Sequence, residues 1–217
     1  MSAEEHVASP TTDRFQPIGD EAERQMAIHL QRAFENNPVV QDFPHRRIVV
    51  FGTTGSGKTT LAQHLALRTG LPYAEQDAWN NLADWQYASA KQFITALDVF
   101  SAQESWIMDG NVPHGINLGW QRADTLIWLD YPAPLVFWRL LNRTIRRGVT
   151  REVLWNGNRE YLPERLFSHR GIVACFFRTH WRHRRDTPQH IASQPHLTVL
   201  KFNRPRDVET WLRGLPF

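Results

Sequence analysis

The sequence has little cysteine, little lysine and no long apolar run. Cys175 is its single cysteine, which excludes an internal disulfide and predicts a reducing compartment. No apolar stretch approaches the length of a membrane span, and the N-terminus lacks the basic and apolar segments of a secretory signal. Internal repeats are missing too. Together these absences predict a cytoplasmic protein without a membrane partner.

Net charge is also low, and the type of charge is more informative than its sum. A formal net charge of +3 in 217 residues does not by itself predict a nucleic-acid or membrane partner. However, 22 of the 25 cationic residues are arginine, the planar, bidentate partner of phosphate and carboxylate groups. With 41% hydrophobic and 12% aromatic residues, the chain can fill a sizeable core. We therefore expect one globular domain with an appended arm.

The arm corresponds to residues 1–44, which are predicted to form a flexible tail and a helical appendage. Residues 1–17 are polar and contain two prolines. Residues 20–36 carry apolar side chains at helical spacing, and Pro38 closes that segment. The pattern leaves open whether the appendage packs on the body or on a neighbouring subunit.

The body, residues 45–217, alternates short apolar strands with amphipathic helices. Its predicted strands cover residues 47–52, 71–77, 105–110, 124–132 and 196–202. Its predicted helices cover residues 60–70, 89–102, 134–147, 172–186 and 205–214. This alternation predicts an α/β fold in which helices cover both faces of a parallel sheet.

The strongest motif lies between the first strand and the first helix of the body. Residues 52–59 read GTTGSGKT and match the phosphate-loop pattern G-x-x-x-x-G-K-[ST] in the required strand-to-helix context. Its glycines free backbone N–H groups for phosphates, and the helix N-terminus adds a favourable dipole. The residues predicted to bind a nucleoside triphosphate are Gly52, Thr53, Gly55, Ser56, Gly57, Lys58, Thr59 and Thr60. Lys58 is expected to reach the outer phosphates, and the Thr59 hydroxyl to ligate Mg²⁺.

Two aspartates at strand ends are candidates for the carboxylate that assists this Mg²⁺ site. Asp109 ends SWIMD and is followed by Gly110, which allows a ligand to approach the backbone closely. Asp130 ends TLIWLD and is followed by Tyr-Pro, which does not. Either aspartate could instead cap the helix that follows its strand. We favour Asp109 as the metal carboxylate.

Four blocks of the body, GTTGSGKTTLAQHLA, WIMDGN, ADTLIWLDYP and WRLLNRTIRR, occur in the order seen in adenylate-kinase-related P-loop kinases. QDAWNNLADW and WIMDGN are similar to blocks of the topology-modulation (FlaR-like) subgroup. The resemblance covers about residues 47–213. It implies a P-loop NTPase of the nucleoside-monophosphate-kinase fold, with a five-stranded parallel sheet and a lid. It also implies Mg·ATP as the phosphoryl donor.

The resemblance also implies the positions of further site residues. The acceptor insert would span about residues 75–104, and the lid about residues 148–170. The residues that would close on the transferring phosphoryl group or border the adenine are Arg139, Arg143, Arg182, Arg185, Asn203 and Arg204. Two departures are evident: the block DGN lacks the arginine of the DGFPR block in adenylate kinases, and the lid lacks a cysteine cluster for zinc.

Cations are distributed unevenly between the two halves of the expected site. Lys91 is the only lysine or arginine between Pro72 and Gln121, whereas residues 139–185 contain 12 arginines. A phosphorylated acceptor would need a bidentate arginine in the insert, and only Arg122 is nearby. We therefore hypothesise an acceptor with hydroxyls, a base or an amine. A nucleoside-monophosphate kinase that uses Arg122 is the alternative.

On the acceptor side, Asp77 is the predicted base or positioning group for the acceptor hydroxyl. Trp79 and Trp85 are predicted to stack on the acceptor, with Gly110 and Asn111 beside them. For Asp77 the alternative is a helix cap, and for both tryptophans it is ordinary burial.

The predicted function is ATP-dependent phosphoryl transfer to a small-molecule acceptor. Its predicted catalytic residues are Lys58, Asp77, Asp109, Arg139, Arg143 and Arg182. The alternative is a nucleotide-dependent DNA-binding regulator, because four arginines and Trp181 fall within residues 178–185. The same arginines also fit a helix that faces the phosphates of ATP. Neither the acceptor nor the oligomeric state follows from the sequence.

Overall fold

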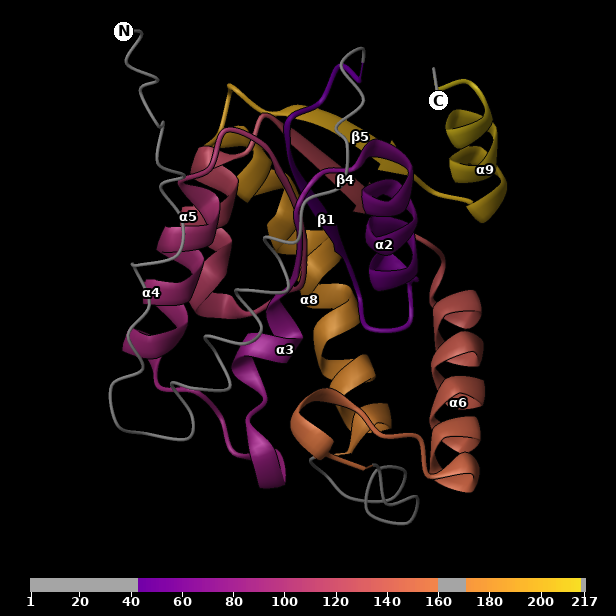
Figure 1. Cartoon of the computed structure of the whole chain (residues 1–217). Helices are drawn as coiled ribbons and strands as arrows, with labels where there is room; N and C mark the ends of the chain where they lie inside the picture. The colour runs from indigo at the N-terminus through magenta and orange to yellow at the C-terminus, as the bar shows by residue number, and fades with distance from the viewer. Residues whose placement is uncertain (1–42, 160–170, 216–217) are drawn as a thin grey trace, which may run out of the picture.

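A computed structural model describes residues 43–159 and 171–215 (Figure 1). The predicted appendage therefore lies outside the described residues, except for its last two positions, and so does the later part of the predicted lid. Phe43 is only 2% exposed and packs in the core of the body. Among the described residues, no helix combines the length and the apolar character needed to cross a membrane.

The centre of the fold is a five-stranded sheet in which all paired strands are parallel. In sheet order, its strands are β2 (Tyr73–Glu75), β3 (Trp106–Asp109), β1 (Arg47–Gly52), β4 (Thr125–Leu129) and β5 (Thr198–Phe202). The predicted α/β class is confirmed. Because β1 lies between β3 and β4, the loops that follow these three strands meet at one edge of the sheet.

Helices cover both faces of this sheet (Figure 1). The helices are α2 (Lys58–Thr69), α3 (Gln76–Asn80), α4 (Ala90–Ser101), α5 (Pro113–Arg122), α6 (Ala133–Thr150), α8 (Ile172–Ala192) and α9 (Pro205–Arg213). Two short 3₁₀ turns, Ala83–Trp85 and Trp155–Gly157, complete the described elements. Helices α4 and α5 lie on one face, and α2 and α9 on the other.

Strand β1 shows why both layers form. Val49 and Phe51 belong to the core built with α4 and α5, whereas Ile48 and Val50 belong to the core built with α2. All four side chains are buried. An apolar run whose alternate residues face opposite sides requires a cover on each side, as is typical of parallel sheets.

The second predicted strand is shorter in the structure than the sequence pattern indicates. Of residues 71–77 only Tyr73–Glu75 pair with β3, and α3 begins at Gln76. The Gln76 amide contacts the Met108 sulfur at 2.9 Å, which draws the chain across the end of β3. Helix α5 was not predicted, because Pro113, Gly115 and Gly119 weaken its helical pattern. Helix α6 continues to Thr150, past the predicted start of the lid.

Candidate active site

The phosphate loop, residues 52–59, connects the central strand β1 to α2. Gly57, the N-cap of α2, has a φ of 92°, a left-handed conformation that favours glycine. Gly55 has a φ of 91°, and a Cβ there would lie 3.0 Å from the Val136 carbonyl oxygen and the Leu140 Cβ. The loop is therefore packed against α6, and its glycines are required by backbone conformation and close contact.

A cavity of about 1120 Å³ opens around this loop. The loop and the start of α2 line it with a continuous run, residues 54–61, which includes Lys58 and Thr59. Gly52 and Thr53 do not line it; the Thr53 carbonyl accepts a hydrogen bond from the Ser56 N–H at 2.9 Å. These two residues thus support the loop from behind rather than face the cavity.

The two candidate metal carboxylates have different surroundings. Asp109 is 1% exposed and accepts hydrogen bonds from the Thr59 hydroxyl at 2.6 Å and the Tyr73 hydroxyl at 2.8 Å. Burial raises the pKa of Asp109 to about 6, although Lys58 opposes the shift. Asp130 instead forms ion pairs with Arg184 at 2.8 Å and Lys201 at 2.9 Å. Only Asp109 therefore contacts the phosphate loop.

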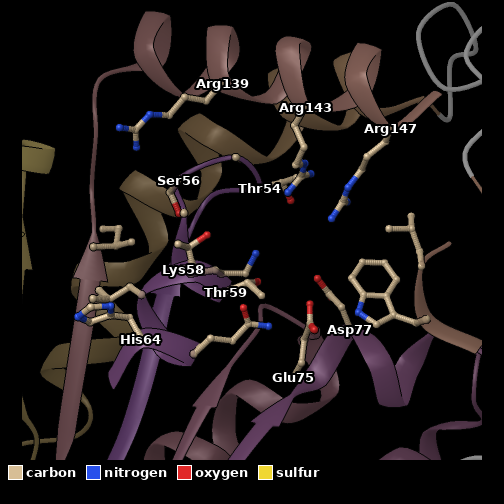
Figure 2. Close-up of a pocket in the computed structure, with 18 of the residues that line it drawn as sticks. Thr54, Ser56, Lys58, Thr59, His64, Glu75, Asp77, Arg139, Arg143 and Arg147 are labelled. Carbon is tan, nitrogen blue, oxygen red and sulfur yellow. The ribbon is translucent and has the colours of Figure 1, made fainter. Parts of the chain in front are cut away.

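Helix α6 presents a row of arginines to the loop. Figure 2 shows Arg139, Arg143 and Arg147 pointing from α6 towards the cavity, with Arg143 beside Thr54. All three line the cavity, and the Arg139 guanidinium lies 5.7 Å from the centre of the Tyr131 ring. Arg147 was not predicted, although the spacing of four residues places it on the same helical face as the other two. This row of cationic side chains on α6 is suited to binding phosphate groups.

Four residues that the resemblance placed near the donor lie elsewhere. Arg182 and Arg185 are exposed and do not line the cavity, and the same holds for Asn203 and Arg204. Arg185 pairs instead with Asp186 at 2.7 Å. The outward position of Arg182 follows from the helix, since α8 buries His180 instead. At the α9 end, the side chains that line the cavity are Pro205, Val208, Glu209 and Leu212.

His183 of α8 lies close enough to the loop to interact with its lysine. Burial first, and then the charges of Arg182 and Lys58, lower the pKa of His183 to about 4. The ring packs against Phe51 of β1, with ring centres 5.4 Å apart. A neutral imidazole is therefore favoured on this cationic side of the site.

The opposite side of the cavity carries carboxylates. Figure 2 shows Glu75 and Asp77 across the cavity from the α6 arginines. We call this side the carboxylate wall; it is lined by Glu75, Asp77, Asn80, Asn81, Trp85, Tyr87 and Trp155. Burial and then the charge of Asp109 raise the pKa of Glu75 to about 7, while a hydrogen bond from Trp155 lowers it.

Several residues predicted to contact the acceptor have structural roles instead. Trp79 is 1% exposed and packs against Phe93 and Phe100 of α4, so the prediction that it stacks on the acceptor is wrong. Arg122 donates hydrogen bonds to the Asp98 carboxylate and the Ser101 hydroxyl and does not line the cavity. Helix α5 holds it against α4, which removes the expected arginine for a phosphorylated acceptor.

Gly110 and Asn111 also act within the protein. A Cβ on Gly110 would lie 2.5 Å from the Gln76 Cβ, so the close approach comes from α3 rather than from a ligand. The Asn111 amide donates to the Gly52 carbonyl oxygen at 2.6 Å and ties the end of β3 to the end of β1. Neither residue lines the cavity.

Two seven-residue turns close the cavity beside the carboxylate wall, and we call them together the clasp. Each turn is bounded by an antiparallel bridge, between Asn81 and Tyr87 in one turn and between Val153 and Arg159 in the other. In each, the second N–H donates to the sixth carbonyl at 2.7 Å, and the sixth N–H donates to the third carbonyl at 3.1 Å. The fourth and fifth residues have a positive φ in both turns.

Asparagine side chains hold the two turns of the clasp together. Asn158 is 4% exposed; its amide donates to the Leu82 carbonyl at 2.7 Å, and its oxygen accepts from the Trp85 N–H at 2.9 Å. The Asn156 amide donates to the Asn81 carbonyl at 2.5 Å. The Trp85 indole donates to the Arg159 carbonyl at 3.1 Å. The segment after α6 is thereby fastened to the segment after α3.

Sequence reasoning did not find the clasp, although a signal is present. The two turns share a spaced pattern, LADWQ at residues 82–86 and LWNGN at residues 154–158, in which Leu, Asp or Asn, and Gln or Asn recur. Trp85 occupies a left-handed position with a φ of 56°, which is uncommon for a bulky residue. Such strain is typical of functional sites.

No protein-family model matches the chain, and no curated protein sequence is significantly similar to it. Among solved structures, shikimate kinase from Acinetobacter baumannii in complex with shikimate is 14% identical, with a TM-score of 0.49, over 78% of this chain and 92% of its own. A sugar kinase from Janibacter sp. HTCC2649 is 19% identical, with a TM-score of 0.42, over 80% and 97%. Shikimate kinase from Bacteroides thetaiotaomicron is 12% identical, with a TM-score of 0.48, over 77% and 94%.

At such low identities and TM-scores these likenesses carry no argument about the activity of this chain. The more specific resemblance to the topology-modulation subgroup stays a prediction. Any inference about function therefore depends on the arrangement of the cavity itself.

Proposed function

We propose that this protein transfers the γ-phosphoryl group of ATP to a hydroxyl or amine of a small-molecule acceptor. The observation that carries the proposal is the polarity of the cavity. The phosphate loop and the α6 arginines lie on one side, and the carboxylate wall lies opposite. A phosphoryl donor and its acceptor need such opposed surroundings, because one is highly anionic and the other must be held as a nucleophile.

On the donor side, the triphosphate is held by residues 54–60 and the α6 arginines. Lys58 is 6% exposed, so its ammonium is desolvated and interacts strongly with phosphate charge. Ser56 is buried, and among the described residues its hydroxyl has no hydrogen-bond partner, so it can donate to a phosphate oxygen. The nucleoside lies towards Tyr131, Pro205 and Leu212, which provide an apolar end to the cavity.

The donor set fits a magnesium ion that arrives with ATP. Thr59 lines the cavity and offers a hard oxygen ligand, whereas Asp109 does not line it and would act from behind, through the hydrogen bond of 2.6 Å that it accepts from the Thr59 hydroxyl. Over residues 43–159 and 171–215, no three His, Cys, Asp or Glu side chains form a metal cluster of their own. Mg²⁺ in proteins commonly takes its remaining ligands from substrate phosphates and water. Bound in this way, it would neutralise negative charge on the triphosphate.

On the acceptor side, Asp77 accepts a hydrogen bond from the acceptor's nucleophilic group. The acceptor oxygen or nitrogen forms a bond to the γ-phosphorus, and the bond from that phosphorus to the β,γ-bridging oxygen breaks. The proton of the nucleophile passes to Asp77, and ADP leaves with the bonding electrons. Little covalent chemistry is asked of the protein, so positioning and charge stabilisation carry the rate.

Water must be kept from the γ-phosphorus for transfer to dominate over hydrolysis. The clasp contributes to this exclusion, because it holds Trp85 and Trp155 in place at the carboxylate wall, where both line the cavity. Its cross-bonds link the segments that follow α3 and α6, so acceptor-side and donor-side elements are held together.

The proposal is tested by measuring ADP release from Mg·ATP with separate pools of sugars, polyols, amino alcohols, nucleosides and nucleoside monophosphates. Acceptor-stimulated release is expected, and it should vanish in Lys58→Ala. Lys91→Ala is the matched control, since Lys91 is an exposed residue of α4 outside the cavity. If no pool stimulates release above the Lys58→Ala background, the proposed function is wrong.

A second candidate function is suggested by one face of α8. Phe177 and Trp181 are 57% and 54% exposed and stack with ring centres 6.3 Å apart, beside the exposed Arg178 and Arg182. Stacked aromatics with arginines suit single-stranded nucleic acid. Salt-dependent binding of a labelled oligonucleotide that is lost in Trp181→Ala would support nucleotide-dependent nucleic-acid binding. Binding unchanged by that substitution would refute it.

A further inference from the structure

We infer that the acceptor is a hydroxylated amine: a small molecule with a cationic amine bound at the carboxylate wall and a separate hydroxyl that receives the phosphoryl group. The inference rests on the proposed function and narrows its acceptor to one charge class. It requires that the carboxylate wall bind cations, repel anions, and bind a neutral compound more weakly than an ammonium group.

The charges of the carboxylate wall are all of one sign. Among the described residues, its carboxylic acids are Glu75 and Asp77, and the remaining lining residues there are amides and aromatics. Glu75 is paired in strand register with Asp109, so a third carboxylate lies directly behind the wall. An anionic acceptor at this wall would therefore meet like charges in a partly buried site, which is strongly unfavourable.

In the proposed function the arginines across the cavity serve the triphosphate, so they do not cancel this charge for an acceptor. Arg147 and Arg146 lie 3.4 and 3.7 Å from the Glu152 carboxylate. Arg139 lies over Tyr131, towards the nucleoside end. Bound Mg·ATP adds further negative charge to the cavity. With Lys58 and the arginines engaged by the triphosphate, the charge that an acceptor meets is that of the carboxylate wall, and a cationic acceptor is the species that balances it.

Aromatic side chains give the wall a second affinity for cations. Trp85, Tyr87 and Trp155 line the same part of the cavity as the two carboxylates. Ammonium groups bind the faces of such rings, and combinations of rings with carboxylates are typical of amine sites. The Asn80 and Asn81 amides line it too and can serve the hydroxyls of the same molecule.

The two carboxylates are assigned different tasks. Asp77 is held at the start of α3 and faces the loop side, so it takes the reacting hydroxyl (Figure 2). Glu75 ends β2 and is held by Trp155 of the clasp, so it takes the amine. Removal of each charge should therefore have a different effect. Loss of the Asp77 charge should lower kcat for every acceptor, and loss of the Glu75 charge should reduce the preference for amines over neutral acceptors.

The test compares matched acceptors with the full-length protein. One set contains amino sugars and amino alcohols, a second has the amine replaced by hydroxyl or hydrogen, and a third has it replaced by carboxylate or phosphate. ADP release above the Lys58→Ala background should give a kcat/KM at least about tenfold higher for the amines, as expected for a desolvated charge pair. A neutral or anionic counterpart that equals its amine overturns the inference. If no acceptor of any set stimulates release above the Lys58→Ala background, the proposed function is wrong instead.

Variants test the assignment of Glu75. Glu75→Gln should reduce the preference for amine over neutral acceptor to about threefold or less and leave the KM for Mg·ATP unchanged. The matched control, Glu104→Gln, removes an exposed carboxylate outside the cavity and should keep the full preference. Binding of amines without ATP, followed by quenching of tryptophan fluorescence, gives a readout independent of turnover. Retention of amine preference in Glu75→Gln would contradict the assignment.

Discussion

The phosphate-loop side and the carboxylate wall of the cavity are built in different ways. The loop side comes mainly from residues 54–61, which are consecutive and run from the turn after β1 into the first residues of α2. The wall comes from residues 75–87, and it is closed by the turn at 153–159, more than sixty positions later in the chain. A site made of consecutive residues can be recognised in the sequence as a motif, whereas a site whose residues come together only on folding cannot.

The two sides also differ in the sign of the charge that they concentrate. On the loop side, burial and the neighbouring cations lower the pKa of His183 to about 4. On the wall side, burial and neighbouring carboxylates raise the pKa of Glu75 to about 7. Each side therefore disfavours its own charge in the free protein. A ligand of opposite charge stabilises the charged form on each side, so ligand binding should depend on the protonation of these groups.

The largest expected effect separates chemistry from donor binding. Asp77→Asn keeps the shape of the side chain but cannot accept the proton of the nucleophile, so kcat should fall about 100-fold or more, with the KM for Mg·ATP unchanged. Steady-state kinetics with an acceptor from the pool that stimulates ADP release measure both. The control is Asp84→Asn, an exposed neighbour that does not line the cavity. A wild-type kcat in Asp77→Asn would remove Asp77 from the mechanism.

The next effect tests whether the clasp connects the two sides. Asn158→Ala removes the hydrogen bonds to Leu82 and Trp85, so the wall loses its fixed position. We expect the KM for the acceptor to rise about tenfold and ATP hydrolysis without acceptor to increase, while the affinity for Mg·ATP stays the same.

The control for the clasp is Asn142→Ala, an exposed asparagine of α6. Circular dichroism should confirm that both variants fold. If Asn158→Ala lowers only the melting temperature and leaves the ratio of hydrolysis to transfer unchanged, the clasp is merely structural.

A third prediction concerns the stability of the free protein. Glu75 has a folded-state pKa of about 7, above its ordinary value of 4.5, so its favourable contribution is present below pH 4.5 and is lost as the pH rises through 7. At pH 8, Glu75→Gln should therefore unfold with about 1 to 2 kcal/mol more free energy than wild type. The gain should shrink towards pH 5. Denaturant titrations at the two pH values, with Glu104→Gln as control, measure it; a gain that does not depend on pH would exclude charge as its cause.

What the sequence predicts well is what depends on neighbours in the chain. The strands, most helices and the phosphate loop follow from local patterns, and the position of Asp109 beside that loop follows from its place at the end of a strand. Trp79 was misassigned because only the packing of α4 against α3 decides that its ring is buried. Arg182 was misassigned because the sequence of α8 does not show which side of the helix is buried. In the structure the side chain of His180 is buried and that of Arg182 is exposed. The clasp required the knowledge that residues 82 and 158 are in contact.

The smallest expected effect concerns Arg122, which the sequence placed at the acceptor. In the structure it joins α5 to α4 through Asp98, at 2.6 Å, and Ser101, at 2.9 Å. Because this pair is partly exposed, Arg122→Ala should lower the free energy of unfolding by about 1 kcal/mol or less. Since the guanidinium does not line the cavity, kcat and both KM values should stay within about twofold of wild type. Steady-state kinetics with amine, neutral and phosphorylated acceptors check this directly. A selective loss of the phosphorylated acceptor would place a phosphate next to α5, and the wall that we assign to the acceptor would then be the wrong one.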